Sequence, residues 1–115
     1  MDLSYSLPLL LAAAALALAP VVAVAGDDNL VFEIRAQAGH FEPSELVVPA
    51  NQPFTIHVTS AEKTAIEFES FELHRERVVQ PGQTITVLMP ALTAGTYKFF
   101  DDFHDDTPEG AIVVK

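Results

Sequence analysis

The C-terminal part of the chain carries a dense group of side chains that bind metal ions. Six of the nine residues from 101 to 109 are acids or histidine: Asp101, Asp102, His104, Asp105, Asp106 and Glu109. Carboxylates together with an imidazole bind iron, manganese, zinc or Cu(II), whereas carboxylates alone suit calcium. The run follows an aromatic stretch, and negative charge near apolar surface is costly without a compensating partner. The stretch is therefore either a solvated polar loop or a cation site.

A second acidic stretch, Glu67-Phe68-Glu69-Ser70, reads as part of a strand. Alternate residues of a strand share one face and lie about 7 Å apart, so Glu67 and Glu69 are placed to reach one ion or two adjacent ions. The alternative is an edge strand with a solvated acidic face, because such charges discourage aggregation. This stretch alone favours the alternative.

Short strands must position these groups, because the chain after residue 25 shows period-2 alternation and almost no helical periodicity. In residues 54–59, for example, Phe54, Ile56 and Val58 are expected to face inward and His57 outward. The pattern predicts an all-β fold, a Greek-key β-sandwich of about seven strands. The expected strands are 31–36, 46–48, 54–59, 66–70, 84–89, 96–103 and 111–115, and residues 71–79 fit either a strand or a short helical turn.

The first 25 residues are typical of a secretory signal peptide, with an apolar run that ends in Ala23-Val24-Ala25. We expect residues 1–25 to be the signal and 26–115 to be one domain. An uncleaved membrane anchor is the alternative, because the apolar run is just long enough to span a bilayer. The expected mature protein is therefore periplasmic or secreted, with no membrane contact after cleavage.

Composition excludes several classes of function. The chain has no cysteine, which rules out a thiol enzyme, a thiolate zinc site and an iron–sulfur cluster. Without Asp2, 15 acids and 6 bases remain, a net charge of −9. Nucleic-acid binding is excluded by that sign, because phosphate contacts need a basic face. A hydrolase has no nucleophile motif to support it.

Residues 95–110, "GTYKFFDDFHDDTPEG", resemble the C-terminal metal loop of cupredoxins, the β-sandwich family of blue-copper proteins. Asp101 stands where that family has its cysteine ligand, His104 stands at the histidine, and Glu109 stands at the methionine. Residues 41–58 resemble the second and third strands of the family, and the remaining ligand would fall close to Glu67. The resemblance thus implies a cupredoxin-like fold and a metal site.

The ligand set that the resemblance implies contains three carboxylates and one imidazole, from Glu67, Asp101, His104 and Glu109. The candidates for supporting positions or a second site are Glu69, Asp102, Asp105 and Glu76. Without a thiolate, a blue-copper centre is not expected. By ligand hardness the set suits iron (Fe2+ or Fe3+) or Cu2+, and also Zn2+ or Mn2+.

A narrower resemblance covers residues 67–82, "EFESFELHRERVVQPG". This stretch is similar to cupredoxin-like domains of bacterial periplasmic iron-uptake proteins of the EfeO type, although Arg77 stands where that pattern has lysine. It implies a metal-binding protein that serves high-affinity iron uptake, with a membrane iron permease as a partner.

Two other functions remain open. One is a ferroxidase that oxidises Fe(II) to Fe(III) before transport, which would make the protein an enzyme. The other is a metal-free interaction module whose acidic loop binds a basic partner. Of the remaining histidines, His40 and His57 are expected to be surface residues, and His74 is expected on an exposed face near Glu72 and Glu76.

Overall fold

The computed structural model describes residues 30–104 and 106–115, and the secondary structure described there is entirely β. The nine strands are β1 (Leu30–Gln37), β2 (His40–Glu42), β3 (Glu45–Val48), β4 (Phe54–Ser60), β5 (Ile66–Ser70), β6 (Arg75–Val79), β7 (Thr84–Met89), β8 (Gly95–Asp101) and β9 (Glu109–Val114). Within the described residues no helix is long and apolar enough to cross a membrane. The expected signal peptide, residues 1–25, lies outside the described residues.

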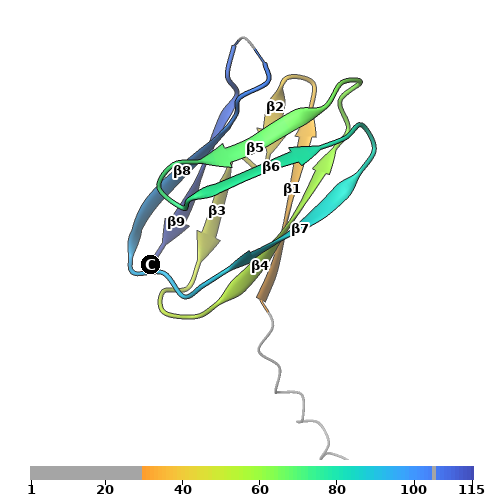
Figure 1. The fold of residues 1–115 in the computed structure, drawn as a ribbon. Coiled ribbons are helices and arrows are strands. Elements are labelled where there is room, and N and C mark those ends of the chain that lie inside the picture. The colour runs from red at the N-terminus through yellow and green to blue at the C-terminus, as the bar shows by residue number, and fades with distance from the viewer. Residues whose placement is uncertain (1–29, 105) are drawn as a thin grey trace, which may run out of the picture.

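The strands form two layers that face each other (Figure 1). One sheet has the order β2-β1-β4-β7 and the other has the order β3-β9-β8-β5-β6. The neighbours β1 and β4 are parallel, as are β3 and β9, and the remaining pairs are antiparallel. This architecture confirms the expected all-β sandwich.

Two strands go beyond the expected number. β2 has only three residues, too few for an alternating pattern to be visible in the sequence. β6 occupies the second half of the stretch 71–79 that fitted either a strand or a turn, and the first half is the turn that joins it to β5.

Alternation determines which side chains enter the core. In β4, Phe54, Ile56 and Val58 are buried while His57 is partly exposed, as predicted. The aromatic centre of the core is Phe99, whose ring packs 5.0 Å from Phe41 and 5.1 Å from Phe68. The three rings come from β2, β8 and β5, so they join both sheets.

The hairpin of β5 and β6 is attached to β8 by a short ladder and by side-chain hydrogen bonds. Phe68 pairs with Asp101, and Glu69 pairs with Phe100. Beyond that point the hydroxyl of Ser70 donates a 2.6 Å hydrogen bond to the carbonyl of Lys98. This attachment places the acidic residues of β5 directly beside the end of β8.

The outer edge of the same hairpin is joined to the other sheet by two arginines. Arg75 donates to the carbonyl of Leu88 at 3.0 Å, and Arg77 donates to the carbonyl of Thr86 at 3.2 Å. Both carbonyls belong to β7, the edge strand of its sheet. The two guanidinium groups thus occupy backbone acceptors that an edge strand otherwise leaves open.

Candidate metal centre

Asp101 is the last residue of β8, and its carboxylate is buried, with 3% of the residue exposed. Oδ1 accepts hydrogen bonds from the backbone N–H groups of Glu67 and Phe103, each at 3.0 Å. A buried carboxylate is tolerated only when its oxygens are compensated. These two bonds supply compensation at Oδ1 and hold the start of the loop against β5.

The other carboxylate oxygen of Asp101 faces His104. Nδ1 of His104 lies 2.5 Å from Oδ2. The contact lacks the alignment of a hydrogen bond, so Nδ1 is a buried nitrogen without a hydrogen-bond partner, the one such side-chain atom among residues 30–104 and 106–115. Nε2 lies 3.4 Å from the hydroxyl of Thr64. An imidazole nitrogen and a carboxylate oxygen so placed can form an ion pair or present two ligand atoms to a cation.

A second group of carboxylates lies on the outer face of the hairpin. One oxygen each from Glu67, Glu69 and Glu76 lies within 4.8 Å of the others. Glu69 and Glu76 are direct cross-strand partners, and Glu67 is on the same face because it is two residues from Glu69. We refer to these three residues as the carboxylate cluster. It is the one group of three or more potential ligands of this spacing in the described part of the chain.

The electrostatics of the carboxylate cluster favour holding a positive charge. Burial raises the pKa of Glu67 to about 7, with further contributions from a hydrogen bond with Glu76 and from the charges of Glu76, Glu69 and Asp102. The pKa of Glu69 is also raised, first by desolvation and then by repulsion from Glu76 and Asp102. Near neutral pH the cluster therefore retains a proton in a position that a cation could occupy instead.

The two groups lie on opposite faces of one sheet. Asp101 pairs with Phe68 and shares its inward face, whereas Glu67, the neighbour of Phe68, points outward. Backbone hydrogen bonds nevertheless join them: Glu67 donates to the Asp101 carboxylate, and the N–H of Asp102 donates to the carbonyl of Glu67 at 3.1 Å. The two groups thus lie on neighbouring strands, β5 and β8, and their side chains are on opposite faces of the sheet.

The four ligands expected from the sequence are accordingly not assembled in one place. Asp101 and His104 lie together, and Glu67 lies with Glu69 and Glu76. Glu109, the first residue of β9, pairs with Phe100 of β8. It lines a surface hollow together with Lys98. Asp102 is exposed in the turn and acts on the carboxylate cluster through its charge. Asp105 lies outside the described residues.

The position of Glu76 beside Glu69 is the part of the carboxylate cluster that sequence patterns predict least well. It joins Glu69 only because the turn at residues 71–74 sets the register of β6 against β5. A strand pattern in residues 75–79 would have revealed it, but only Val79 in β6 is buried, so no alternation is visible there.

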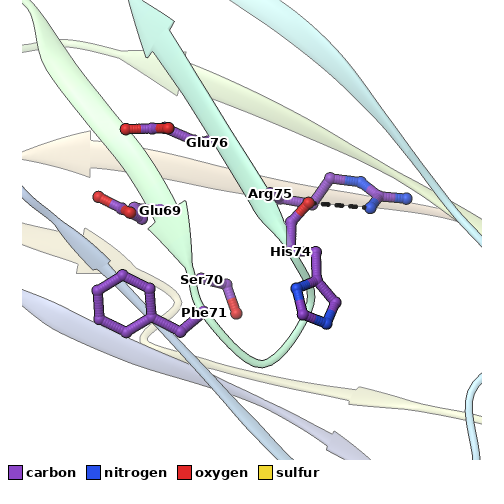
Figure 2. A pocket seen from close by; sticks show the side chains of 6 residues that line it. All are labelled: Glu69, Ser70, Phe71, His74, Arg75 and Glu76. Atoms are coloured by element: carbon purple, nitrogen blue, oxygen red, sulfur yellow. Dashed lines mark hydrogen bonds between the residues drawn. The ribbon is translucent and has the colours of Figure 1, made fainter.

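Two of the other histidines, His57 and His40, have carboxylate partners nearby. His57 lies 2.9 Å from the carboxylate of Glu33 on the outer face of its sheet. His40 lies 2.8 Å from Glu42, and the hydrogen bond to that carboxylate is the main cause of its raised pKa. Figure 2 shows the imidazole of His74 across the turn from the carboxylates of Glu69 and Glu76. These histidines are not assigned to the candidate metal centre.

The amino-acid sequence is similar to a protein-family model and to a bacterial protein. A family model described as a cupredoxin-like domain matches residues 8–114. An uncharacterized protein of Rickettsia prowazekii (strain Madrid E) is 36% identical over 88 residues, which cover 76% of this chain and 70% of that protein.

Two solved structures resemble the sandwich at low sequence identity. Auracyanin A, a blue copper protein from the green thermophilic photosynthetic bacterium Chloroflexus aurantiacus, has a TM-score of 0.64 and 17% identity, covering 76% of this chain and 100% of that chain. A chain of a haem-copper terminal oxidase dimer has a TM-score of 0.64 and 16% identity, covering 75% of this chain and 65% of that chain. With a family match that spans residues 8–114, the chain belongs to the cupredoxin-like domain family.

Proposed function

We propose that this protein binds a metal ion, iron or Cu(II), at the carboxylate cluster of Glu67, Glu69 and Glu76. The observation that carries the proposal is the convergence of three carboxylates within 4.8 Å around a glutamate that is only 8% exposed. Burial and repulsion both oppose three negative charges at this place. A cation with oxygen ligands relieves both costs at once.

The chemistry of the donor set separates this site from a blue-copper centre. The chain contains no cysteine, so it cannot supply the thiolate that a blue-copper site requires. Carboxylate oxygens without an imidazole suit hard cations such as Fe(III), Mn(II) and Ca(II), and they also bind Fe(II), Cu(II) and Zn(II). The residues present therefore do not fit the blue-copper centre of the cupredoxins, but they do fit a cation that is bound by oxygen ligands.

Asp101 and His104 form a second candidate position within this proposal. Their support is different: a buried imidazole nitrogen without a hydrogen-bond partner faces a buried carboxylate oxygen. Because Oδ1 of Asp101 is already used by two backbone N–H groups, only Oδ2 is free to act as a ligand. Two ligand atoms make a weaker site than three, so the carboxylate cluster is the primary position.

The biological setting that we propose is metal delivery in iron uptake outside the cytoplasm, with a membrane iron permease as the receiver. The support comes from the resemblance of residues 67–82 to periplasmic iron-uptake proteins and from the signal-like N-terminal segment. Two of the three cluster residues, Glu67 and Glu69, lie in the first part of that resembling stretch, and Glu76 lies in its second part.

The site assignment is tested with two variants that remove the same number of acids. The triple variant E67Q/E69Q/E76Q removes the cluster, and E33Q/E42Q/E45Q removes three glutamates from β1, β2 and β3. Calorimetric titration with Fe(II) under anaerobic conditions, and with Cu(II), measures the affinity. We expect the first variant to lose at least 100-fold in affinity and the second to lose less than threefold.

A third variant separates the two candidate positions. D101N/H104Q keeps side chains of similar size but removes the carboxylate charge and the imidazole. Retained affinity in this variant together with lost affinity in the cluster variant supports the primary position. The reverse result overturns it and assigns the ion to Asp101 and His104.

A further inference from the structure

An exposed aromatic pair lies immediately beside the carboxylate cluster. Phe71, in the turn after β5, is 71% exposed, and its ring packs edge-on against Phe100 with centroids 5.2 Å apart. Of the four ring pairs in the part of the chain that the structure describes, this is the one in which neither ring is buried. A large apolar side chain held at the surface in this way is typical of a contact site.

Phe71 lines two surface hollows. One has a volume of about 410 Å3 and is bounded by Phe71, Glu69, Glu76 and the turn residues (Figure 2). The other, of about 260 Å3, is also lined by Phe71, together with the aromatic rings of Phe99 and Phe100. A partner that covers the ring would therefore contact both hollows.

The rim of these hollows is acidic. Glu69 and Glu76 border the first hollow, and Glu72 and Glu109 border the second. Of the three basic side chains that line the hollows, Arg75 is directed away from the carboxylates, toward the carbonyl of Leu88. His74 lines the first hollow together with Glu69 and Glu76, and Lys98 lines the second together with Glu72 and Glu109, so, apart from Arg75, two carboxylates accompany one basic side chain in each hollow.

We propose that this surface, which we call the Phe71 patch (Phe71, Phe100 and the surrounding Glu69, Glu72, Glu76 and Glu109), docks a partner protein whose contact surface is apolar at its centre and rich in lysine or arginine at its rim. The negative charge of the four glutamates decides which of the possible occupants fits. A second copy of this chain would bring the same four glutamates against themselves, and an anionic membrane surface would be repelled. A basic protein surface satisfies both the exposed ring and the acidic rim. The patch shares Glu69 and Glu76 with the carboxylate cluster, but Phe71, Phe100, Glu72 and Glu109 lie outside that cluster and support the inference without a bound metal.

The chain provides a matched control for the ring. Leu88 is 70% exposed on the outer face of the other sheet, so Leu88→Ser removes a comparable exposed apolar side chain elsewhere. Phe71→Ser removes the ring from the patch, and Phe71→Leu keeps an apolar side chain there. The double variant E72Q/E109Q removes two rim charges, and a glutamine at 72 retains the oxygen that accepts the backbone N–H of Lys98.

The probe is a synthetic peptide that alternates lysine with leucine, titrated into 15N-labelled protein in the presence of EDTA so that metal binding plays no part. We expect backbone shift changes centred on Phe71 and Phe100, and an affinity that falls at least tenfold between 50 and 300 mM salt. Phe71→Ser should weaken binding at least tenfold, E72Q/E109Q about threefold, and Leu88→Ser less than twofold. Phe71→Leu should bind within about threefold of the wild-type protein.

Several results would overturn the proposal. Equal weakening by Phe71→Ser and Leu88→Ser would show non-specific apolar contact, and shift changes spread over all acidic surfaces would show non-specific charge contact. Equal binding of a peptide with glutamate in place of lysine would remove the charge argument. A concentration-dependent dimer that Phe71→Ser abolishes, or binding to phosphatidylglycerol vesicles, would assign the patch to one of the rejected occupants. Circular dichroism of each variant confirms that it is folded.

Discussion

The backbone N–H of Glu67 donates a 3.0 Å hydrogen bond to the buried Oδ1 of Asp101, while the side chains of these two residues lie on opposite faces of one sheet. A single residue step along a strand reverses the face to which a side chain points. As a result, the acids of this end of the molecule form two groups rather than one. The carboxylate cluster faces outward, and Asp101 with His104 closes the loop on the inner side.

The raised pKa of Glu67 predicts how the stability of the metal-free protein depends on pH. The folded state holds the proton up to about pH 7, whereas the ordinary pKa is 4.5. In that interval the folded state binds more protons than the unfolded state, so the contribution is fully present below about pH 4.5 and is lost as pH rises to about 7. Urea denaturation in EDTA at several pH values measures it. The variant E67Q should have a flatter profile over this interval, and an unchanged profile would contradict the assigned pKa.

Metal should reverse this loss of stability. At pH 7 a cation replaces the proton and removes the repulsion between Glu67, Glu69 and Glu76. An ion at 100 times its dissociation constant stabilises the folded state by about 2.7 kcal/mol. Thermal unfolding with Cu(II) and then with excess EDTA tests this expectation. The shift should vanish in E67Q/E69Q/E76Q and remain in E33Q/E42Q/E45Q; equal shifts in both variants would place the ion elsewhere.

Asp101 should be essential for the fold as a hydrogen-bond acceptor. Asp101→Ala leaves the N–H groups of Glu67 and Phe103 without their acceptor, and each unsatisfied buried donor costs about 1–3 kcal/mol. Asp101→Asn retains an acceptor oxygen and should lose clearly less. Denaturant unfolding at constant pH measures the difference. The control Asp102→Ala, at an exposed neighbour, should change stability by no more than about 0.5 kcal/mol. Equal losses in the Asn and Ala variants would contradict this role.

Gly110 should be intolerant of any side chain. A Cβ atom at this position would lie 2.3 Å from the ring of Phe99 and 2.8 Å from the carbonyl oxygen of Ser44. Overpacking of this kind costs about 1–3 kcal/mol. The double-mutant cycle of Gly110→Ala with Phe99→Leu, measured by denaturant unfolding, isolates the contact because the shorter leucine relieves part of the clash. A coupling energy near zero would show that the ring is not the obstacle.

Much of the fold could be predicted from alternation alone. Residues 54–59 and 84–89 show inward and outward positions clearly, because both strands bury one face against the core. β6 gave no such signal, since Arg75 and Arg77 are held by contacts across the sandwich edge rather than by burial. The three residues of β2 are too few for any period to be recognised.

The site could be predicted only in its local parts. Asp101 and His104 are three residues apart and meet within one loop, and Glu67 and Glu69 share a face because they are two residues apart. The association of Glu76 with this pair depends on hairpin register. The separation of Glu109 from Asp101 depends on the ladder that places Glu109 beside Phe100. Such long-range pairings are set by tertiary structure, which local patterns do not encode.

The most direct test of the central claim is the position of the ion itself. Crystals of the protein soaked in Cu(II), or grown anaerobically with Fe(II), give anomalous difference maps at the copper and iron absorption edges. We predict a peak on the outer face of β5 and β6, within coordination distance of carboxylate oxygens of Glu67, Glu69 and Glu76. A peak between Asp101 and His104 with none at the carboxylate cluster, or no peak at either edge under saturating metal, would contradict the account.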